Sequence, residues 1–252
     1  MTRHGGQKVL KRLNTPKYLQ IKRKHGKFFI NPSPGSHSKR FCLPLLYIVR
    51  DLLHIVETHR EAKKLIGLGY FKVDGKIIRD KGYPVGLMDI LSIEKMNIHY
   101  RVLPDSHYGL ILHEIPEEES TFKLCRINGK TTIKGGHLQL NLHDGRNILV
   151  LVKDPKNPKE DIFKRMDVLK INVPEQEILR NLQFKENNLA LIMSGKNVGQ
   201  IGTIKAIKKL FGPNASTVSI EDESGVITET LYDYTFIIGV DQSEINLPKI
   251  VT

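Results

Sequence analysis

The chain has 252 residues, of which 40% are hydrophobic and 26% are charged, as in folded proteins of one to three domains. It contains no run of about 18 apolar residues that would predict a transmembrane helix, and we expect no signal peptide, because its first residues lack an apolar core. The two cysteines lie far apart, which argues against a disulfide framework and favours a reducing compartment.

The net charge of +12 is concentrated at one end of the chain. Residues 1–50 contain twelve Lys or Arg and no Asp or Glu, while the other 27 basic residues are balanced by the 27 acidic ones. A segment of this kind indicates a polyanionic partner, and nucleic acid is favoured. A solubilising tail and an anionic membrane surface are the alternatives, but glycine, proline, serine and asparagine interrupt the segment too often for a membrane-binding amphipathic helix.

Residues 1–40 are predicted to be a basic, mostly extended arm. Pro16, Gly26, Pro32, Pro34 and Gly35 prevent long helices, although a short helix near residues 6–13 is compatible with the sequence. Such an arm cannot bury enough apolar surface to offset its ordering entropy. We therefore expect it to be disordered alone and ordered on RNA.

Residues 41–94 are predicted to be a compact unit of two helices and a hairpin. Residues 43–56 are strongly apolar, with Pro44 at the expected first helical position. Thr58 and Glu61 have the spacing of a capping box and predict a second helix, which Gly67 and Gly69 end. An Asp-Gly pair at residues 74–75, between β-prone runs, then predicts a tight hairpin, and residues 87–93 predict another strand.

The rest of the chain is predicted to be β-rich. Residues 95–180 contain short apolar runs separated by turns, as in a small meander or barrel. Residues 181–240 predict a second module of five strands near residues 189–193, 203–207, 218–220, 225–230 and 236–238. Residues 241–252 are a short tail.

The two-helix unit resembles a known RNA-binding domain. The stretches Phe71-Lys72-Val73-Asp74-Gly75-Lys76 and Gly86-Leu87-Met88-Asp89-Ile90-Leu91 are similar to the hallmark of the domain named after ribosomal protein S4. On the second helix, Arg60, Lys63 and Lys64 share one face, and Lys72 and Lys76 flank the nearby turn. A rigid platform of cations of this kind would bind an RNA backbone. The alternative interpretation is an ordinary helix face exposed to solvent.

A second motif lies at Gly195-Lys196-Asn197-Val198-Gly199-Gln200-Ile201-Gly202, which resembles the KOW motif of ribosomal and transcription-elongation proteins. Its glycines would let the loop approach a phosphate backbone, with Lys196 and Asn197 facing the ligand. A P-loop is disfavoured, because no Gly-Lys-Ser/Thr ending occurs and no helix follows. An ordinary hairpin loop is the alternative.

The order of these parts is similar to that of the eukaryotic and archaeal family of ribosomal protein S4. Matching stretches include Lys11-Arg12-Leu13, Thr15-Pro16-Lys17-Tyr18, Lys123-Leu124-Cys125 and His143-Asp144-Gly145-Arg146, although the family usually has Trp where Tyr18 stands. The resemblance implies an α+β multidomain fold: an extended basic arm (1–40), an S4-like RNA-binding domain (41–94), a central β-rich domain (95–180), an SH3-like KOW barrel (181–240) and a tail (241–252).

The same resemblance implies a structural protein of the small ribosomal subunit in the cytosol. The expected partners are small-subunit ribosomal RNA and neighbouring ribosomal proteins, with no membrane, no homo-oligomer, no cofactor, no metal and no catalytic residue. An RNA-modifying enzyme of the pseudouridine synthase type and a KOW-containing transcription or translation factor are the alternatives. The predicted RNA-binding residues are Lys8, Lys11, Arg12, Lys17, Tyr18 (as a stacking group), Lys22, Arg23, Lys24, Lys27, Lys39, Arg40, Arg50, Arg60, Lys63, Lys64, Lys72, Lys76, Lys196 and Asn197.

Overall fold

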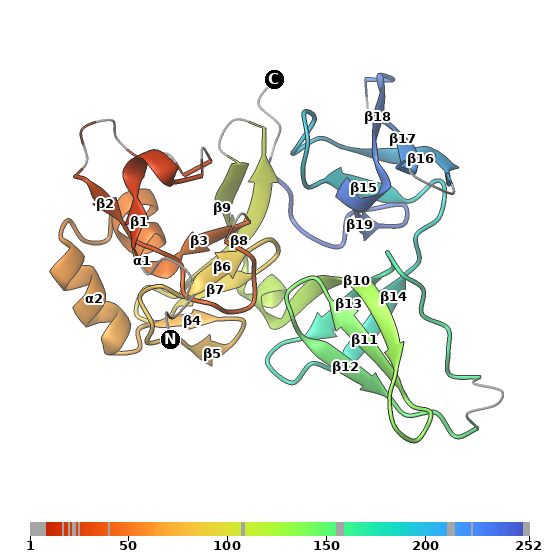
Figure 1. Ribbon diagram of the computed structural model, residues 1–252, viewed down its shortest axis with the longest axis horizontal. Helices are drawn as coiled ribbons and strands as arrows, with labels where there is room; N and C mark the ends of the chain where they lie inside the picture. Colours follow the sequence, from red (N-terminus) through yellow and green to blue (C-terminus); the bar gives the residue numbers. More distant parts are fainter. Residues whose placement is uncertain are drawn as a thin grey trace, which may run out of the picture.

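The computed structural model describes residues 9–16, 18–19, 21, 24, 26–39, 41–106, 109–154, 159–210, 215–222 and 224–248. These residues form three five-stranded sheets, two two-stranded ribbons and a small number of short helices. In Figure 1 the N-terminal sheet and the helices lie on the left, the central sheet at the lower right and the C-terminal sheet at the upper right. The described helices are all too short or too polar to cross a membrane.

The N-terminal segment is anchored on the first domain. Strands β1 (Leu10–Lys11) and β2 (Phe28–Phe29) pair antiparallel, with Leu10 opposite Phe29 and Lys11 opposite Phe28. Leu10, Leu19 and Phe29 are buried in the same core as the helices. The expectation that the arm buries too little apolar surface to be ordered is therefore wrong for its described part, because these separated residues dock onto the apolar surface of the domain.

The helices largely follow their predicted signals. The short helix α1 (Leu45–Tyr47) continues as a π-helical turn (Ile48–Leu52), and Pro44 caps it rather than forming its first residue. Helix α2 (His59–Gly67) begins with the predicted capping box. In the arm, the structure has β1 and a 3-10 turn (Arg12–Asn14) in place of the helix considered for residues 6–13; residues 6–8 lie outside the described residues.

The sheet of the first domain extends beyond the predicted boundary at residue 94. Its strand order is β5-β4-β7-β8-β9, and the tight turn at Asp74 and Gly75, both with positive φ, joins β4 to β5 as predicted. Strands β8 and β9, which the sequence placed in the central domain, pair with β7 and continue this sheet. The strands are β3 (Cys42–Pro44), β4 (Phe71–Val73), β5 (Lys76–Ile77), β6 (Pro84–Gly86), β7 (Ile90–Ile93), β8 (Ile98–Asp105) and β9 (Gly109–Ile115).

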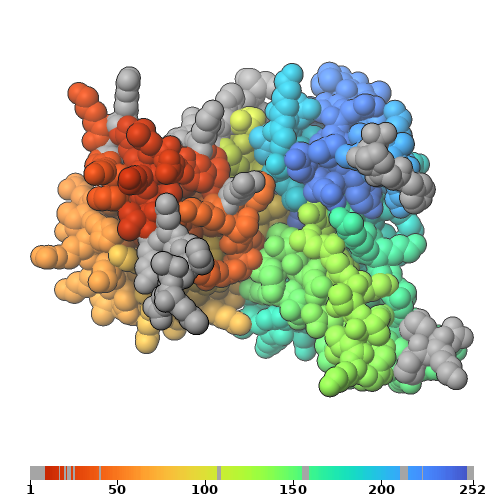
Figure 2. Space-filling view, viewed as in Figure 1, coloured from red at the N-terminus to blue at the C-terminus, as the bar shows by residue number. Residues whose placement is uncertain are grey.

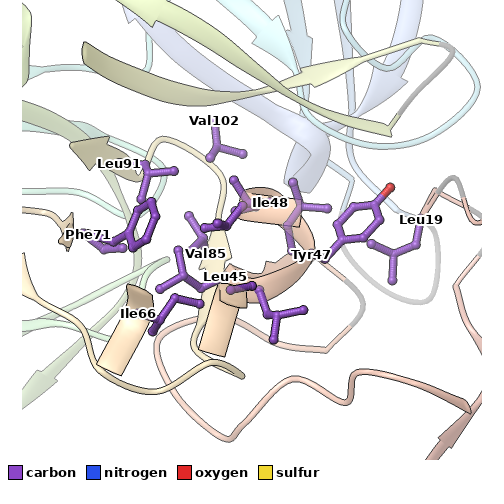
Figure 3. Packing of buried hydrophobic residues seen from close by; sticks show 14 of the residues in the cluster. Leu19, Leu45, Tyr47, Ile48, Ile66, Phe71, Val85, Leu91 and Val102 are labelled. Atoms are coloured by element: carbon purple, nitrogen blue, oxygen red, sulfur yellow. The ribbon is translucent and has the colours of Figure 1, made fainter. Parts of the chain in front are cut away.

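A single apolar core joins the arm, the helices and this sheet. Figure 3 shows Leu45 and Ile48 of the helical segment packed among Phe71, Val85 and Leu91 of the strands. The buried ring of Phe29 meets Tyr47 edge to face at 5.4 Å between ring centroids. This core makes α2 and the β1–β2 ribbon parts of one rigid surface.

The central and C-terminal sheets are antiparallel, with the orders β12-β11-β10-β13-β14 and β18-β17-β16-β15-β19. A 3-10 turn (Glu117–Thr121) leads into the central sheet. All five strands predicted for the last module are present, whereas the predicted boundary at residue 180 falls within β14. The strands are β10 (Phe122–Thr132), β11 (Leu138–Leu142), β12 (Asn147–Val150), β13 (Val168–Asn172), β14 (Ile178–Leu182), β15 (Leu189–Ile192), β16 (Ile201–Lys208), β17 (Thr217–Glu221), β18 (Ile227–Leu231) and β19 (Thr235–Gly239), the last preceded by a 3-10 turn (Tyr232–Tyr234).

Candidate nucleic-acid interface

Helix α2 presents the predicted cations to solvent. Ala62 and Ile66 are buried in the core, while Arg60, Lys63 and Lys64 are exposed. The backbone N–H of Glu61 donates to Thr58 Oγ1 at 3.3 Å, and the Glu61 carboxylate accepts from the N–H of Thr58 at 3.3 Å. Because this capping box satisfies free N–H groups at the helix start, the cationic face is carried on a well-defined helix.

The β1–β2 ribbon adds a second cationic surface. Alternation along the strands buries Leu10 and Phe29 and exposes their neighbours Lys11 and Phe28. The Lys27 ammonium lies 5.6 Å from the centroid of the Phe28 ring, within cation–π range. The ribbon therefore presents an exposed aromatic ring and two lysines beside the helical part of the domain.

Among the described residues, the predicted cations Arg50 and Lys72 are paired with carboxylates. Arg50 Nη2 lies 2.7 Å from Asp51 Oδ2, and Lys72 forms an ion pair with Glu94. Lys76, beyond the tight turn, is exposed. Arg50 and Lys72 are therefore less available to a phosphate than the exposed cations of α2, the ribbon and Lys76.

Tyr18 lies half-buried between the arm and the domain. Its hydroxyl lies 2.9 Å from the carbonyl oxygen of Lys39 and 3.0 Å from that of Cys42, and its ring packs against the first core. Burial raises the pKa of Tyr18 well above its ordinary value. The structure thus gives Tyr18 a role in anchoring the arm, and its role as a stacking group stays a prediction.

The remaining arm cations divide into two groups. Lys24 and Lys39 are exposed, and Arg12 is half-exposed. A further five predicted residues lie outside the described residues, namely Lys8, Lys17, Lys22, Arg23 and Arg40.

The glycine-bearing loop of the last module packs against the first domain. Gly199 has φ +85°, and a Cβ at this position would lie 3.0 Å from the backbone nitrogen of Ser106. This glycine therefore permits a close approach between two parts of the protein. The sequence had instead predicted that the loop glycines approach a nucleic-acid backbone. Lys196 is exposed and Asn197 half-exposed in the same loop, separate from the cations of α2.

A buried ion cluster, which the sequence did not predict, joins the first domain to the central sheet. Lys123 of β10 is fully buried, and its ammonium donates to Asp74 at 2.8 Å, Asp89 at 2.5 Å and Asp144 at 3.0 Å. Arg146 Nη2 lies 2.6 Å from Asp74 Oδ2. Asp74 and Asp89 of the S4-like domain thus meet Lys123, Asp144 and Arg146 of the central sheet in one cluster.

The cluster also reaches the arm. His37 Nε2 lies 2.9 Å from Asp89 Oδ1, and the other oxygen of Asp89 accepts from the N–H of Gly86. Burial alone would raise the pKa of Asp89, but Lys123 and His37 outweigh it and hold this pKa well below its ordinary value. Asp144 has a pKa lowered to about 2, because Lys123 and other neighbouring cations outweigh its burial. Asp89 and Asp144 are therefore ionised at neutral pH.

A second junction fixes the last module on the central sheet. Arg126 Nη1 donates to the backbone oxygens of Asp233 at 2.7 Å and Thr235 at 3.0 Å. Lys170 of β13 forms an ion pair with Glu244 at 2.8 Å. These contacts place the three bodies in the close arrangement seen in Figure 2.

Among the described residues, one group of side chains has the composition of a metal site. The ligand atoms of Cys125, His143 and Asp144 lie within 4.8 Å of one another. The Lys123 ammonium, however, already supplies the positive charge at Asp144, and burial raises the pKa of the Cys125 thiol well above its usual value. Because a metal binds the thiolate and would have to replace this lysine, the group does not fit a metal centre.

Three family models match successive parts of the chain. Residues 4–40 match the RS4NT (NUC023) domain, residues 45–91 the S4 domain, and residues 96–178 the Ribosomal family S4e. The small ribosomal subunit protein eS4 of Aeropyrum pernix is 48% identical over 249 residues, covering 99% of this chain and 98% of the relative. The corresponding protein of Staphylothermus marinus is 49% identical and covers 99% of both chains.

The chain belongs to the S4e family of ribosomal proteins. A solved S4e structure, the 30S ribosomal protein S4e of Thermoplasma acidophilum, is 32% identical and has a TM-score of 0.64, covering 77% of this chain and 93% of that one. The S4 match spans both helices and the hairpin, and the S4e match begins just before β8. The family resemblance read from the sequence is thereby confirmed.

Proposed function

We propose that this chain is a structural constituent of the small ribosomal subunit that binds and stabilises folded ribosomal RNA. The observation that carries the proposal is the rigid cationic surface of α2 and the β1–β2 ribbon, in a chain whose S4e relatives are named small ribosomal subunit proteins. Exposed lysine and arginine side chains on a fixed scaffold bind phosphates and orient the protein without reading base sequence.

The buried ion cluster and the C-terminal module support this RNA-binding surface. The buried cluster around Lys123 holds the S4 domain and the central sheet in one orientation. We infer that the five-stranded C-terminal module is an SH3-like KOW barrel, supported by its strand order and its glycine-bearing loop. We expect neighbouring ribosomal proteins and RNA to contact its exposed Lys196, in a cytosolic ribosome.

The enzyme alternative has no support from the comparisons. The relatives that match this chain over almost its full length are ribosomal proteins, not pseudouridine synthases or transcription factors. We expect no catalytic residue, no cofactor and no homo-oligomer.

Binding to small-subunit ribosomal RNA should depend steeply on salt. If eight to ten cations engage phosphates, the logarithm of the affinity should fall with the logarithm of the salt concentration at a slope of about −6 to −9. Filter binding between low and moderate salt measures this slope, and sedimentation should show about one copy per small subunit after a moderate-salt wash. A slope near −1, or absence from the subunit fraction, would contradict the proposal.

Reversing the charge of Lys63 and Lys64 together, to glutamate, should weaken RNA binding on the order of tenfold or more and make the salt slope shallower by roughly 1.5 to 2. Both side chains are exposed on α2, so the fold should be retained. The matched control is the double reversal of Lys134 and Lys153, which are exposed on the central domain and carry the same change in charge. Equal effects of the two double variants would show that net charge, and not the α2 face, determines binding.

A further inference from the structure

A groove beside the β1–β2 ribbon combines an aromatic wall with a basic wall. It has a volume of about 530 Å³ and lies between β2, the helical segment and the start of α2. Val9, Phe28 and Ile30 line one side, and Arg50, His59 and Lys81 line the other. None of the described residues that line it is acidic. Phe28 is 57% exposed, an unusual position for a phenylalanine, and its ring is available for contact.

The basic wall is held in place by its own contacts. Lys81 Nζ lies 3.3 Å from His59 Nε2, and because an ammonium group can only donate, the imidazole nitrogen accepts. Burial, followed by the charges of Lys81, Arg50 and Lys63, lowers the pKa of His59. Arg50 is partly neutralised by Asp51, so Lys81 and Lys63 carry the net positive charge here.

These two walls match the two halves of a nucleotide. An exposed aromatic ring stacks on any base, and neighbouring cations bind the attached phosphate. The volume lies within the range of about 300–1,000 Å³ found for sites that bind small molecules. A base-paired helix could reach the cations of α2 but could not insert a stacked base, because its bases are already stacked on one another.

We propose that this groove binds a single unstacked nucleotide of ribosomal RNA, with its base on Phe28 and its phosphate beside Lys81 and His59. This inference rests on the proposed function. It adds a preference for unpaired nucleotides, which cations alone do not give. Backbone contacts bind paired and unpaired RNA alike, whereas this groove requires a bulged or looped-out residue. It would fix the position of the ribbon on the RNA.

The test compares Phe28→Ala with the unchanged full-length chain on two RNA probes. One is a single-stranded oligouridylate of about ten nucleotides, and the other is a duplex of the same length. Loss of one stacked base should weaken binding of the single strand about tenfold, with little change for the duplex and no change in the salt slope. Fluorescence anisotropy measures both affinities.

Two control variants separate stacking from damage to the fold. Phe28→Tyr keeps an aromatic ring and should retain the affinity. Phe41→Ala removes a ring of similar exposure (51%) that lies outside the groove and should leave both affinities unchanged. The thermal unfolding of all three variants should match that of the unchanged protein.

The outcomes distinguish this site from the proposed function. If Phe28→Ala binds both probes normally while the Lys63 and Lys64 double reversal still weakens binding to ribosomal RNA, the protein binds RNA but the groove holds no base. Equal losses for Phe28→Ala and Phe41→Ala would also overturn the site. If the unchanged protein ignores ribosomal RNA at low salt, the proposed function fails as well.

Discussion

Replacing Lys123 with alanine is expected to lower the free energy of unfolding by about 3–5 kcal/mol, because it removes the shared partner of three buried carboxylates. Asp74, Asp89 and Asp144 all accept hydrogen bonds from this one ammonium group, and each is less than a tenth exposed. Without it, Arg146 still pairs with Asp74 and Asp144, and His37 still contacts Asp89, but no group contacts all three carboxylates among the described residues. Denaturant-induced unfolding, followed by circular dichroism, measures the loss.

The matched control is Lys130→Ala. Lys130 is also a lysine of β10, and its ammonium lies 2.7 Å from Asp161 Oδ2, but this pair is at the surface, with side chains 30% and 25% exposed. Exposed ion pairs contribute only about 0–1 kcal/mol, so this variant should remain close to the unchanged protein. Similar losses for the two variants would refute a special role for the buried cluster.

A second substitution tests the physical cause of the loss. If Lys123→Ala destabilises the protein through uncompensated charge, adding Asp89→Asn should cost less in this background than alone, because it removes one of the stranded carboxylates. A double variant in which the two losses simply add would place the cause in packing instead. The comparison requires only the two single variants and the double variant.

The elements that the sequence predicted well are those specified by neighbouring residues. The Asp74-Gly75 pair encodes a tight turn through positive φ at both residues, and Thr58 and Glu61 form their capping box within one helical turn. The strands of the last module are likewise bounded by local turn residues. In each case the physical cause lies within a few positions along the chain.

The buried cluster and the docked arm depend on residues that are distant in sequence. Lys123 lies 49 residues from Asp74 and 21 from Asp144 along the chain, and a lysine in a strand is normally assigned to the solvent face. Leu10, Leu19 and Phe29 have no regular spacing, so their burial follows only from the apolar surface that the domain provides. Asp74 and Asp89 carry the resemblance to the S4 domain, but nothing in the sequence around them indicates a shared partner.

Only part of the candidate RNA-binding surface could be predicted, because some of it depends on contacts between residues distant in sequence. The exposure of Arg60, Lys63 and Lys64 follows from helical periodicity, and the structure confirms it. The pairing of Lys72 with Glu94, across a distance of 22 residues, depends on strand β7 lying beside β4. Charge content along the chain therefore predicts a basic surface but not which of its cations remain available to a phosphate.

Acidification should destabilise the fold through His143, well before the aspartates of the cluster are protonated. Burial, together with the positive charges of Lys123 and His37, lowers the pKa of His143 from 6.5 to about 3, despite the opposing effect of Asp144. His143 lines a cavity, and both of its ring nitrogens have protein partners. The backbone N–H of Arg126 donates to Nδ1 at 3.2 Å, and Nε2 lies 3.2 Å from the Leu87 carbonyl oxygen. This arrangement requires a neutral ring that carries its proton on Nε2.

The sign of the effect follows from proton binding. Below pH 6.5 the unfolded chain protonates His143 and the folded protein does not, so stability is complete above pH 6.5 and is lost as the pH falls toward 3. The contribution of this histidine is at most about 1.4 kcal/mol per pH unit. Asp89 and Asp144, whose pKa values are lowered, add to the loss only below about pH 4, and Asp74, whose burial raises its pKa, acts in the opposite direction.

The measurement is the free energy of unfolding of the unchanged protein and of His143→Gln between pH 7 and about 4. Glutamine keeps a donor and an acceptor but cannot become charged, so the two stability curves should converge as the pH falls. His54→Gln removes an exposed histidine and should leave the shape of the curve unchanged. Parallel curves for the unchanged protein and His143→Gln would mean that the folded protein tolerates a charged imidazole at this junction. The neutral ring would then not be what holds β10 beside the Leu87 turn.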